Sequence, residues 1–313
     1  MTAPHSILRF LTAENATGQR TALIILTGIE GSAARGIGTL MGVSERGAYQ
    51  GSISGGCVEP ALVGEAQRVM AAGRTESLRI GTGSPLIDIR LPCGSGLDLL
   101  IVPLPQDGRA VAQAVAALSA RNTATLIFSR DGELALMDAP TATGWQADRF
   151  ALHLRPPLRL VLAGHGEEVT ALAALGSAWG AEVMILSPEQ RILDACAGMG
   201  ETQLLKSASN PPALTLDPWS ALVMLFHDHD WETALLAAAV SQPALFIGAM
   251  GSRATQASRL ETLTAAGVSA GNLARITGPI GLIPAARDPQ TLALSVLAQV
   301  VAAYGPQPDS HAT

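Results

Sequence analysis

Residues 158–167 read Leu-Arg-Leu-Val-Leu-Ala-Gly-His-Gly-Glu, and this stretch decides the fold of the second half of the chain. Its first six residues are apolar apart from Arg159, as expected of a parallel strand that is buried on both faces. Two glycines and then a helical pattern follow. The same succession of an apolar strand and a helix recurs further along the chain, which predicts a doubly wound α/β fold with a parallel sheet.

The remaining elements of this half extend that pattern. Strands are predicted at residues 158–163, 182–186, 222–226 and 245–247. Helices are predicted at residues 169–179, 189–197, 232–240, 253–266 and 289–304. We therefore expect one domain over residues 158–304, followed by a disordered tail at 305–313.

The first 137 residues follow a different pattern, which mixes hairpins with few helices. Helices are predicted at residues 4–18, 57–72 and 109–120. Strands are predicted at residues 21–29, 38–43, 48–53, 78–81, 87–91, 97–104, 125–128 and 134–137. We expect an α+β N-terminal domain over residues 1–137, joined to the second domain by a polar, proline-containing linker at 138–157.

Composition narrows the classes of function. The chain of 313 residues has a formal charge of −6, which argues against a nucleic-acid partner because such binding relies on basic patches. Its single lysine, Lys206, nearly excludes Schiff-base chemistry and lysine-dependent phosphate loops. No apolar run approaches the roughly 18 residues of a membrane span. Three cysteines without CxxC spacing suit a reduced, cytoplasmic protein.

A glycine-rich segment in the first half places a cysteine at the start of a predicted helix. It reads Ser54-Gly55-Gly56-Cys57-Val58-Glu59. The glycines allow a tight turn and close approach of a ligand, and the exposed N–H groups of a helix start favour the thiolate of Cys57. The alternative is a small buried cysteine that caps a turn. A second cysteine, Cys93, also has a glycine neighbour, whereas Cys196 lies in an ordinary helix pattern and is predicted to be core.

In the second half, Gly164 and Gly166 stand between a strand and a helix. Such a pair can bring backbone N–H groups close to a phosphate. The third glycine of the dinucleotide-binding fingerprint is missing, and Ser187 occupies the place of the expected ribose-binding acid. These features favour a phosphate-bearing ligand over a tightly held NAD, with a ligand-free turn as the alternative.

The strand at residues 222–226 is followed directly by His227-Asp228-His229-Asp230. Ligands of open parallel sheets sit outside the carboxyl ends of the strands, so this position favours a function. A protein-held metal would need a third ligand at a recognisable spacing, and the sequence offers none. We favour hydrogen bonds that orient a polar ligand, with a solvated loop as the alternative.

Gly251-Ser252-Arg253 stands between the strand at 245–247 and the next helix. Here a helix N-terminus, a hydroxyl and a guanidinium can converge on an anion. The alternative is a serine that caps the helix beside a surface arginine. Because all three loops are expected on one edge of the sheet, the binding interpretation of each is strengthened.

Together these segments resemble the xanthine dehydrogenase accessory family (XdhC/CoxI), which serves molybdenum enzymes, over nearly the whole chain. The matching stretches are residues 30–35, 51–59 with Ser-Gly-Gly-Cys-Val-Glu, 92–94, 164–166, 227–229, 247–248 with 251–253, and 278–282. This sequence departs from the family pattern at Ala34 (usually proline), Glu167 (commonly histidine), Ser187 (an acid) and residues 283–285.

The resemblance implies a protein that is not a turnover catalyst. It implies binding and protection of molybdenum cofactor, as molybdopterin or its cytidine dinucleotide form, and delivery to a molybdenum hydroxylase apoenzyme of the xanthine dehydrogenase/aldehyde oxidase type. It also implies help with exchanging an oxo for a sulfido ligand together with a cysteine desulfurase, and a homodimer. The implied fold is a small N-terminal domain carrying the cysteine loop and a C-terminal Rossmann-like domain.

On this basis we expect Cys57 to contact the metal end of the cofactor. The expected cofactor-binding residues are Gly55, Gly56, Cys57, Glu59, Cys93, Gly164, Gly166, His227, Asp228, His229, Gly251, Ser252 and Arg253. There are two alternatives to this interpretation. One is an NAD(P)-dependent oxidoreductase that uses the strand–helix domain, and the other is a metal hydrolase built on residues 227–230.

Overall fold

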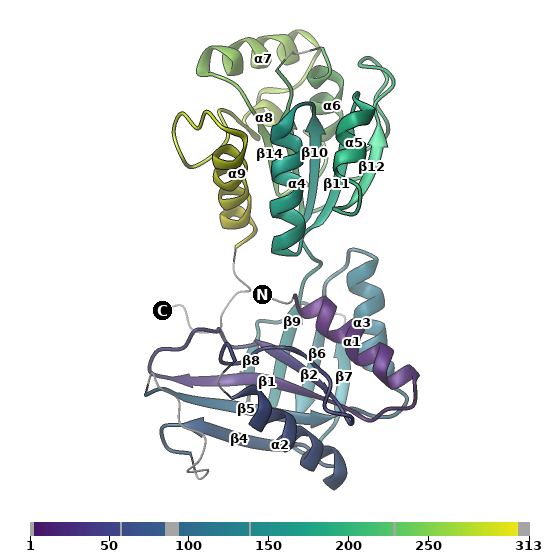
Figure 1. Cartoon of the computed structure of the whole chain (residues 1–313), viewed down its shortest axis with the longest axis vertical. Coiled ribbons are helices and arrows are strands. Elements are labelled where there is room, and N and C mark those ends of the chain that lie inside the picture. The colour runs from purple at the N-terminus through teal and green to yellow at the C-terminus, as the bar shows by residue number, and fades with distance from the viewer. Residues whose placement is uncertain (1–2, 57, 85–93, 138, 228–229, 306–313) are drawn as a thin grey trace. The chain divides into compact units, whose positions relative to one another are not determined.

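The computed structural model describes residues 3–56, 58–84, 94–137, 139–227 and 230–305 of the chain. The chain divides between Pro156 and Pro157 into two compact units. Purple and blue mark the first unit in Figure 1, and teal, green and yellow mark the second. Each unit has hydrophobic clusters of its own.

A five-stranded antiparallel sheet in the order β3-β2-β1-β5-β4 forms the centre of the first unit (Figure 1). Its strands are β1 (Thr21–Glu30), β2 (Leu40–Ser44), β3 (Tyr49–Gly51), β4 (Glu76–Gly81) and β5 (Gly96–Pro103). β1 takes the middle position because its long apolar run suits burial on both faces, and its first seven residues are buried.

Alternate side chains of β1 belong to two separate cores. Ile24 and Leu26 pack on one face against helix α2 (Glu59–Ala72). Leu23 and Ile25 pack on the other face, in a cluster shared with α1 (Pro4–Ala16), α3 (Arg109–Ser119) and a second sheet. The α+β character predicted for this half is confirmed.

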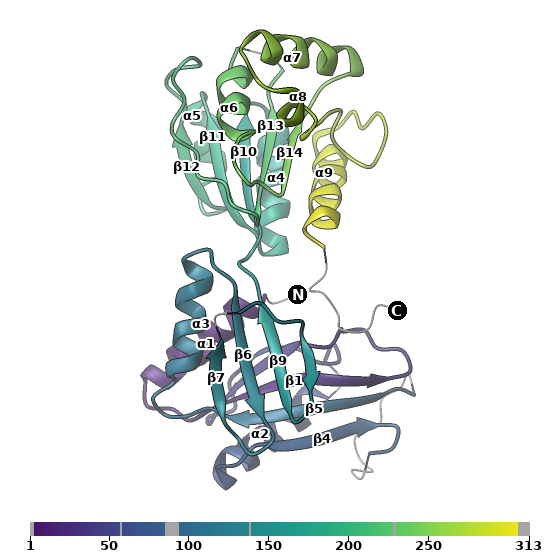
Figure 2. The ribbon, with the colours of Figure 1, turned by 180° about the vertical axis from the view of Figure 1, so that it is seen from behind.

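The second sheet of this unit contains two strands within residues 138–157, where a linker was predicted. They are β8 (Gly144–Gln146) and β9 (Arg149–Leu154), which join β6 (Ala124–Ser129) and β7 (Leu134–Met137) in the antiparallel order β7-β6-β9-β8 (Figure 2). The alternating Phe150, Leu152 and Leu154 of β9 are buried. The linker prediction missed this strand because prolines and charges surround a short apolar alternation, whose partner is β6.

The second unit is built on a six-stranded parallel sheet in the order β12-β11-β10-β13-β14-β15. Its strands are β10 (Arg159–Gly164), β11 (Glu182–Ser187), β12 (Glu201–Leu204), β13 (Ser220–Leu225), β14 (Phe246–Ala249) and β15 (Ile276–Thr277). Because β10 lies in the middle and later strands are added on either side, the strand order reverses between β10 and β13. The predicted doubly wound parallel fold is confirmed.

Helices cover both faces of this parallel sheet (Figure 2). One core contains α4 (Glu167–Trp179), α5 (Gln190–Ala195) and α9 (Pro289–Tyr304), together with Cys196, which is buried as predicted. The other contains α6 (Glu232–Ala239), α7 (Arg253–Ala265) and α8 (Ala270–Leu273).

Three of these elements were not predicted: β12, β15 and α8. All four residues of β12 are exposed and β15 has two residues, so neither leaves a hydrophobic pattern in the sequence. The strand predicted at residues 87–91 and all but the first residue of the predicted tail lie outside the described residues. Within the described ranges, no helix has the length and apolar character needed to cross a membrane.

Candidate functional site

The cysteine loop, residues 52–58, is folded around the carboxylate of Glu59. Its Oε1 accepts hydrogen bonds from the N–H groups of Ile53 (3.0 Å), Ser54 (2.9 Å) and Gly55 (3.2 Å) and from the hydroxyl of Ser52 (2.7 Å). Its Oε2 accepts from the hydroxyl of Ser54 (3.0 Å) and the N–H of Val58 (3.2 Å). Glu59 is only 2% exposed, so these donors replace the water that a carboxylate otherwise binds.

The loop keeps this buried carboxylate charged. Burial raises the pKa of Glu59, but the N–H of Ser54, the hydroxyl of Ser52 and the other donors of the loop lower it from 4.5 to about 2. Both oxygens are occupied by the loop itself. Glu59 therefore acts as the anchor of the loop, a role different from the cofactor contact that the sequence predicts.

Two glycines form an open part of the same loop. Gly55 and Gly56 have φ angles of 97° and 123°, which residues with side chains rarely adopt. Apart from each glycine and its chain neighbours, no described atom lies within 4 Å of the place where a Cβ would sit. Among the described residues, none packs against the Cβ side of these two glycines, which directly precede position 57. Cys57 itself lies outside the described residues.

Cys93 also lies outside the described residues, but the segment after it is held in place. Thr82 donates hydrogen bonds to the carbonyl groups of Gly94 (2.8 Å) and Ser95 (3.0 Å). Leu97, just beyond this segment, packs in the same hydrophobic cluster as Ile53 and Val58 of the cysteine loop. The two cysteine-bearing segments are therefore anchored in one core.

An ion cluster that the sequence did not reveal lies beside the second segment. Arg79 on β4 forms ion pairs with Asp98 on β5 (2.9 Å) and with Glu30 at the end of β1. Glycines make room for it, since a Cβ on Gly28 would lie 2.7 Å from Oδ2 of Asp98 and one on Gly96 would lie 2.6 Å from Nη2 of Arg79. The one signal in the sequence was Glu30, which begins a stretch that carries the family resemblance.

In the second unit, Gly164 and Gly166 shape the turn at which the strand order reverses. A Cβ on Gly164 would lie 2.5 Å from the carbonyl oxygen of Leu225 on β13. Gly166 is the N-cap of α4 and has a φ of 90°. The fold by itself therefore requires both glycines, as the ligand-free alternative states.

Two histidines meet at this turn from the ends of neighbouring strands. The backbone N–H of His227 donates to Nε2 of His165 (3.4 Å), and the centroids of the two rings are 5.5 Å apart. Nε2 of His227 lies 3.8 Å from Oε1 of Glu168. The structure thus brings His227 to the glycine turn, whereas Asp228 and His229 lie outside the described residues. Within the part of the chain that is described, no three His, Cys, Asp or Glu side chains are arranged so that they could hold one metal ion.

The first turn of α4 is acidic. It carries Glu167 and Glu168, and a Cβ on Gly166 would lie 2.6 Å from Oε2 of Glu168. This carboxylate therefore lies over the glycine turn, where its charge would repel a phosphate. The prediction that Gly164 and Gly166 hold a phosphate does not fit this arrangement.

The first turn of α7 suits an anion better. It contains no acidic residue, and Arg253 at its start is exposed. Within the described ranges, the guanidinium of Arg253 forms no hydrogen bond or ion pair. Oγ of Ser252 accepts a hydrogen bond from the N–H of Thr255 (3.1 Å), so Ser252 caps the helix, and Gly251 has a φ of 138°. β10, β13 and β14 are parallel neighbours, so the three predicted loops do emerge on one edge of the sheet.

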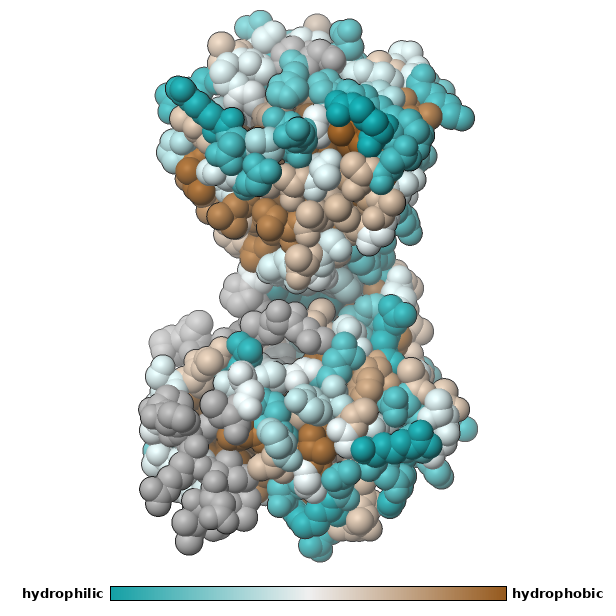
Figure 3. Space-filling view, viewed as in Figure 1, coloured by the Kyte–Doolittle hydropathy of each residue, from teal (hydrophilic) through white to brown (hydrophobic). Residues whose placement is uncertain are grey.

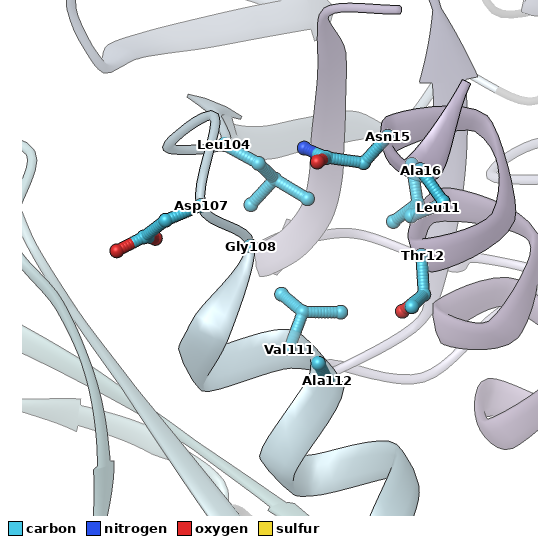
Figure 4. Close-up of a pocket in the computed structure, with 9 residues that line it drawn as sticks. All are labelled: Leu11, Thr12, Asn15, Ala16, Leu104, Asp107, Gly108, Val111 and Ala112. Atoms are coloured by element: carbon cyan, nitrogen blue, oxygen red, sulfur yellow. The ribbon is translucent and has the colours of Figure 1, made fainter. Parts of the chain in front are cut away.

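The first unit also has a pocket between α1 and α3 with a volume of about 180 Å³ (Figure 4). It is below the roughly 300 Å³ at which small-molecule sites usually begin. Its wall is formed by apolar side chains that include Leu11, Leu104 and Val111, with Asn15 and Asp107 at the edge. None of the residues predicted to bind a ligand lines it.

Comparisons with known proteins find matches to both units of the chain. A family model described as XdhC and CoxI family matches residues 15–81, and one described as XdhC Rossmann domain matches residues 160–300. The molybdenum cofactor insertion chaperone PaoD of Escherichia coli (strain K12) is 35% identical over 296 residues, which are 94% of this chain and 87% of that protein. The chain belongs to the XdhC/CoxI family.

The two matched ranges of this XdhC/CoxI protein contain the cysteine loop and the loops of the parallel sheet, whereas the segment that follows Cys93 lies outside both. The first includes the cysteine loop and Glu59, and the second includes the three loops of the parallel sheet. A solved structure described as a xanthine dehydrogenase from Bacillus halodurans has the same fold, with a TM-score of 0.77, 19% sequence identity and 95% of each chain covered. The family relative PaoD is named as an insertion chaperone rather than as a catalyst.

Proposed function

We propose that this XdhC/CoxI protein binds and protects molybdenum cofactor, assists its sulfuration and delivers it to an apoenzyme of the xanthine dehydrogenase/aldehyde oxidase type. The E. coli relative is named for molybdenum cofactor insertion, and this chain matches it over 94% of its length. The structural observation that carries the proposal is the cysteine loop, which a buried and fully bonded carboxylate holds open.

Two features of this loop support the proposed ligand. Gly55 and Gly56 leave space for close approach of a ligand to the backbone. Val58 is the N-cap of α2, so position 57 directly precedes a helix start, where a thiolate is favoured. When bound, the cofactor would supply a molybdenum atom, which is soft enough to accept a thiolate neighbour. In this proposal Cys57 contacts the metal end, and Cys93 assists.

The phosphate or cytidine dinucleotide end of the cofactor needs an anion site. We place it at the start of α7, where Arg253 is exposed and the first turn of the helix carries no carboxylate. Arginine presents a planar, permanently charged fork that suits phosphate. His227, and with it Asp228 and His229, would orient the polar ring system. The start of α4 is left out, because Glu167 and Glu168 make it unsuitable for phosphate.

The proposal includes partners. A molybdenum hydroxylase apoenzyme receives the cofactor, and a cysteine desulfurase supplies the sulfur for the sulfido ligand. We further propose a homodimer that works in the cytoplasm. The net charge of −6 is consistent with a protein partner rather than a polyanion.

An NAD(P)-dependent oxidoreductase is the alternative that the strand order favours, since dinucleotides bind where the order of such a sheet reverses. Two observations count against it. The acidic start of α4 occupies the usual pyrophosphate position, and Ser187 at the end of β11 is buried. The hydroxyl oxygen of Ser187 accepts a hydrogen bond from the N–H of Glu189 (3.2 Å). A change in NADH fluorescence on mixing would revive this alternative.

Loading tests the proposal directly. The purified protein is exposed to molybdopterin without oxygen, and bound metal and pterin are measured by elemental analysis and by pterin fluorescence after oxidation. We expect the wild type to retain both and Cys57→Ser to retain little while melting at the same temperature. Cys93→Ser is the comparison variant and should lose less. Full retention by Cys57→Ser would remove Cys57 from the site, and no retention by the wild type would refute the proposed function.

A further inference from the structure

A buried ion pair lies within the second unit, next to the loops that follow β13 and β14. Arg259 on α7 and Glu232 at the start of α6 have side chains that are 3% and 1% exposed. Nε of Arg259 donates to Oε2 of Glu232 (2.9 Å), and Nη2 donates to Oε1 (3.1 Å). Such a bidentate ion pair fixes the orientation of both groups, because the planar guanidinium matches the geometry of the carboxylate.

The same guanidinium holds the loop after β14. Nη2 of Arg259 donates a further hydrogen bond to the carbonyl oxygen of Met250 (2.7 Å). Met250 directly precedes the Gly251–Arg253 segment in which the anion site is proposed. Because Glu232 begins the helix that follows residues 227–231, Arg259 connects the loop after β13 with the loop after β14.

A third loop is connected through Gln256. Nη1 of Arg259 donates to Oε1 of Gln256 (2.6 Å), and Nε2 of Gln256 donates to the carbonyl oxygen of Ile276 on β15 (3.3 Å). A Cβ on Gly278 would lie 2.2 Å from Oε1 of Gln256, so the chain beyond β15 passes directly against this amide. Residues 278–282 belong to the stretches that carry the family resemblance.

We infer that Arg259 is a positioning residue that holds the loops after β13, β14 and β15 in the arrangement needed to bind the cofactor. This inference rests on the proposed function for the identity of the ligand. Arg259 is buried and does not touch the ligand itself. Its buried side chain holds the loops in place, while the exposed Arg253 on the same helix contacts the ligand.

The positioning role of Arg259 can be separated from a purely stabilising role, because a buried ion pair contributes little net stability to the fold. Replacing such a pair by apolar residues of similar size is often neutral for folding, whereas removing one partner leaves a buried unpaired charge. The double variant Arg259→Met/Glu232→Leu therefore separates the two roles. It keeps the packing but lacks the donors that hold Met250 and Gln256.

The first measurement needs no ligand. Hydrogen–deuterium exchange of the full chain is followed for peptides that cover residues 226–232, 250–256 and 276–283. We expect all three to exchange about tenfold faster or more in the double variant, with peptides of β10, β11 and α4 unchanged. Arg259→Lys keeps a charge opposite Glu232 but not the fork, and it should show a smaller increase in the same three peptides. Unchanged exchange, or faster exchange in one loop alone, would overturn the inference.

Arg275→Met is the matched control. Arg275 directly precedes β15 and donates to the carbonyl oxygens of Val240, at the end of α6, and Ala244 (3.0 Å to the latter), so it holds the connection before β14 rather than the loop after it. Its loss should lower the melting temperature and leave exchange in the three loops unchanged. Equal loosening of the loops in this control would show a general loss of stability and overturn the positioning role.

The second measurement is retention of molybdopterin by the loaded protein. We expect the double variant to bind about tenfold more weakly than the wild type, and Arg275→Met to bind as the wild type does at a temperature where both are folded. Wild-type retention by the double variant would overturn the inference. If the wild type itself retains no molybdopterin, the proposed function fails, and the exchange measurement alone decides the positioning role.

Discussion

Glu59 shows how much a single side chain fixes in this protein. Its carboxylate organises residues 52–58 through backbone N–H groups and hydroxyls, and it is almost completely buried. A neutral amide of the same shape loses the charge and turns an N–H₂ group toward these donors. We expect Glu59→Gln to reduce the free energy of unfolding by about 1.5–3 kcal/mol, the usual range for hydrogen bonds to a charged group. Thermal or urea unfolding at neutral pH measures this loss.

The pH dependence of this effect follows from the lowered pKa of Glu59. Because the loop lowers that pKa from 4.5 to about 2, the charged carboxylate stabilises the folded state at pH above 4.5, and this stabilisation is lost as the pH falls toward 2. The difference in melting temperature between wild type and Glu59→Gln should therefore shrink across this range. A difference that stays constant with pH would mean that Glu59 acts by shape alone.

At the scale of single elements, the starts of α4 and α7 divide the edge of the parallel sheet into an acidic and a basic part. At the start of α7, two neighbouring residues have different roles. Arg253 is exposed and available for binding, whereas Ser252 caps the helix by accepting a hydrogen bond from the N–H of Thr255. We expect Arg253→Ala to weaken cofactor binding about ten- to a hundredfold without changing the melting temperature of the empty protein. Ser252→Ala should cost about 1 kcal/mol of stability.

These two variants serve as controls for each other in binding and melting measurements. Unchanged binding together with lower stability in Arg253→Ala would make this arginine structural and place the phosphate elsewhere. The acidic start of α4 offers a further comparison, since Glu168→Gln removes a repelling charge and should not weaken binding of the phosphate end.

At the scale of the whole molecule, the two units have separate cores. Among the described residues, none of the clusters around β1 shares a member with the clusters around β10, and the chain divides between Pro156 and Pro157. We expect the fragment of residues 157–306 to fold alone with a cooperative thermal transition and native-like circular dichroism. A fragment without such a transition would show that the second unit depends on the first for its stability.

The sequence by itself determined the elements whose hydrophobic period is long and regular. Burial on one or both faces imposes such periods on the sequence. They made it possible to predict the apolar strands β10 and β13, the helices α2 and α9, and the change from hairpins to alternating strands and helices. The sequence also showed the glycines at positions 55 and 56 and the order of the polar loops, and these features indicated the family.

Only the tertiary structure decided what depends on partners distant in the sequence. β9 is a strand because β6 pairs with it, and β12 and β15 are strands because a neighbour extends the sheet to them. The roles of Glu59, Glu168 and Arg259 were likewise hidden. A charged residue type does not say whether its partner is water, its own loop or a buried side chain, and burial in the folded chain supplies that choice.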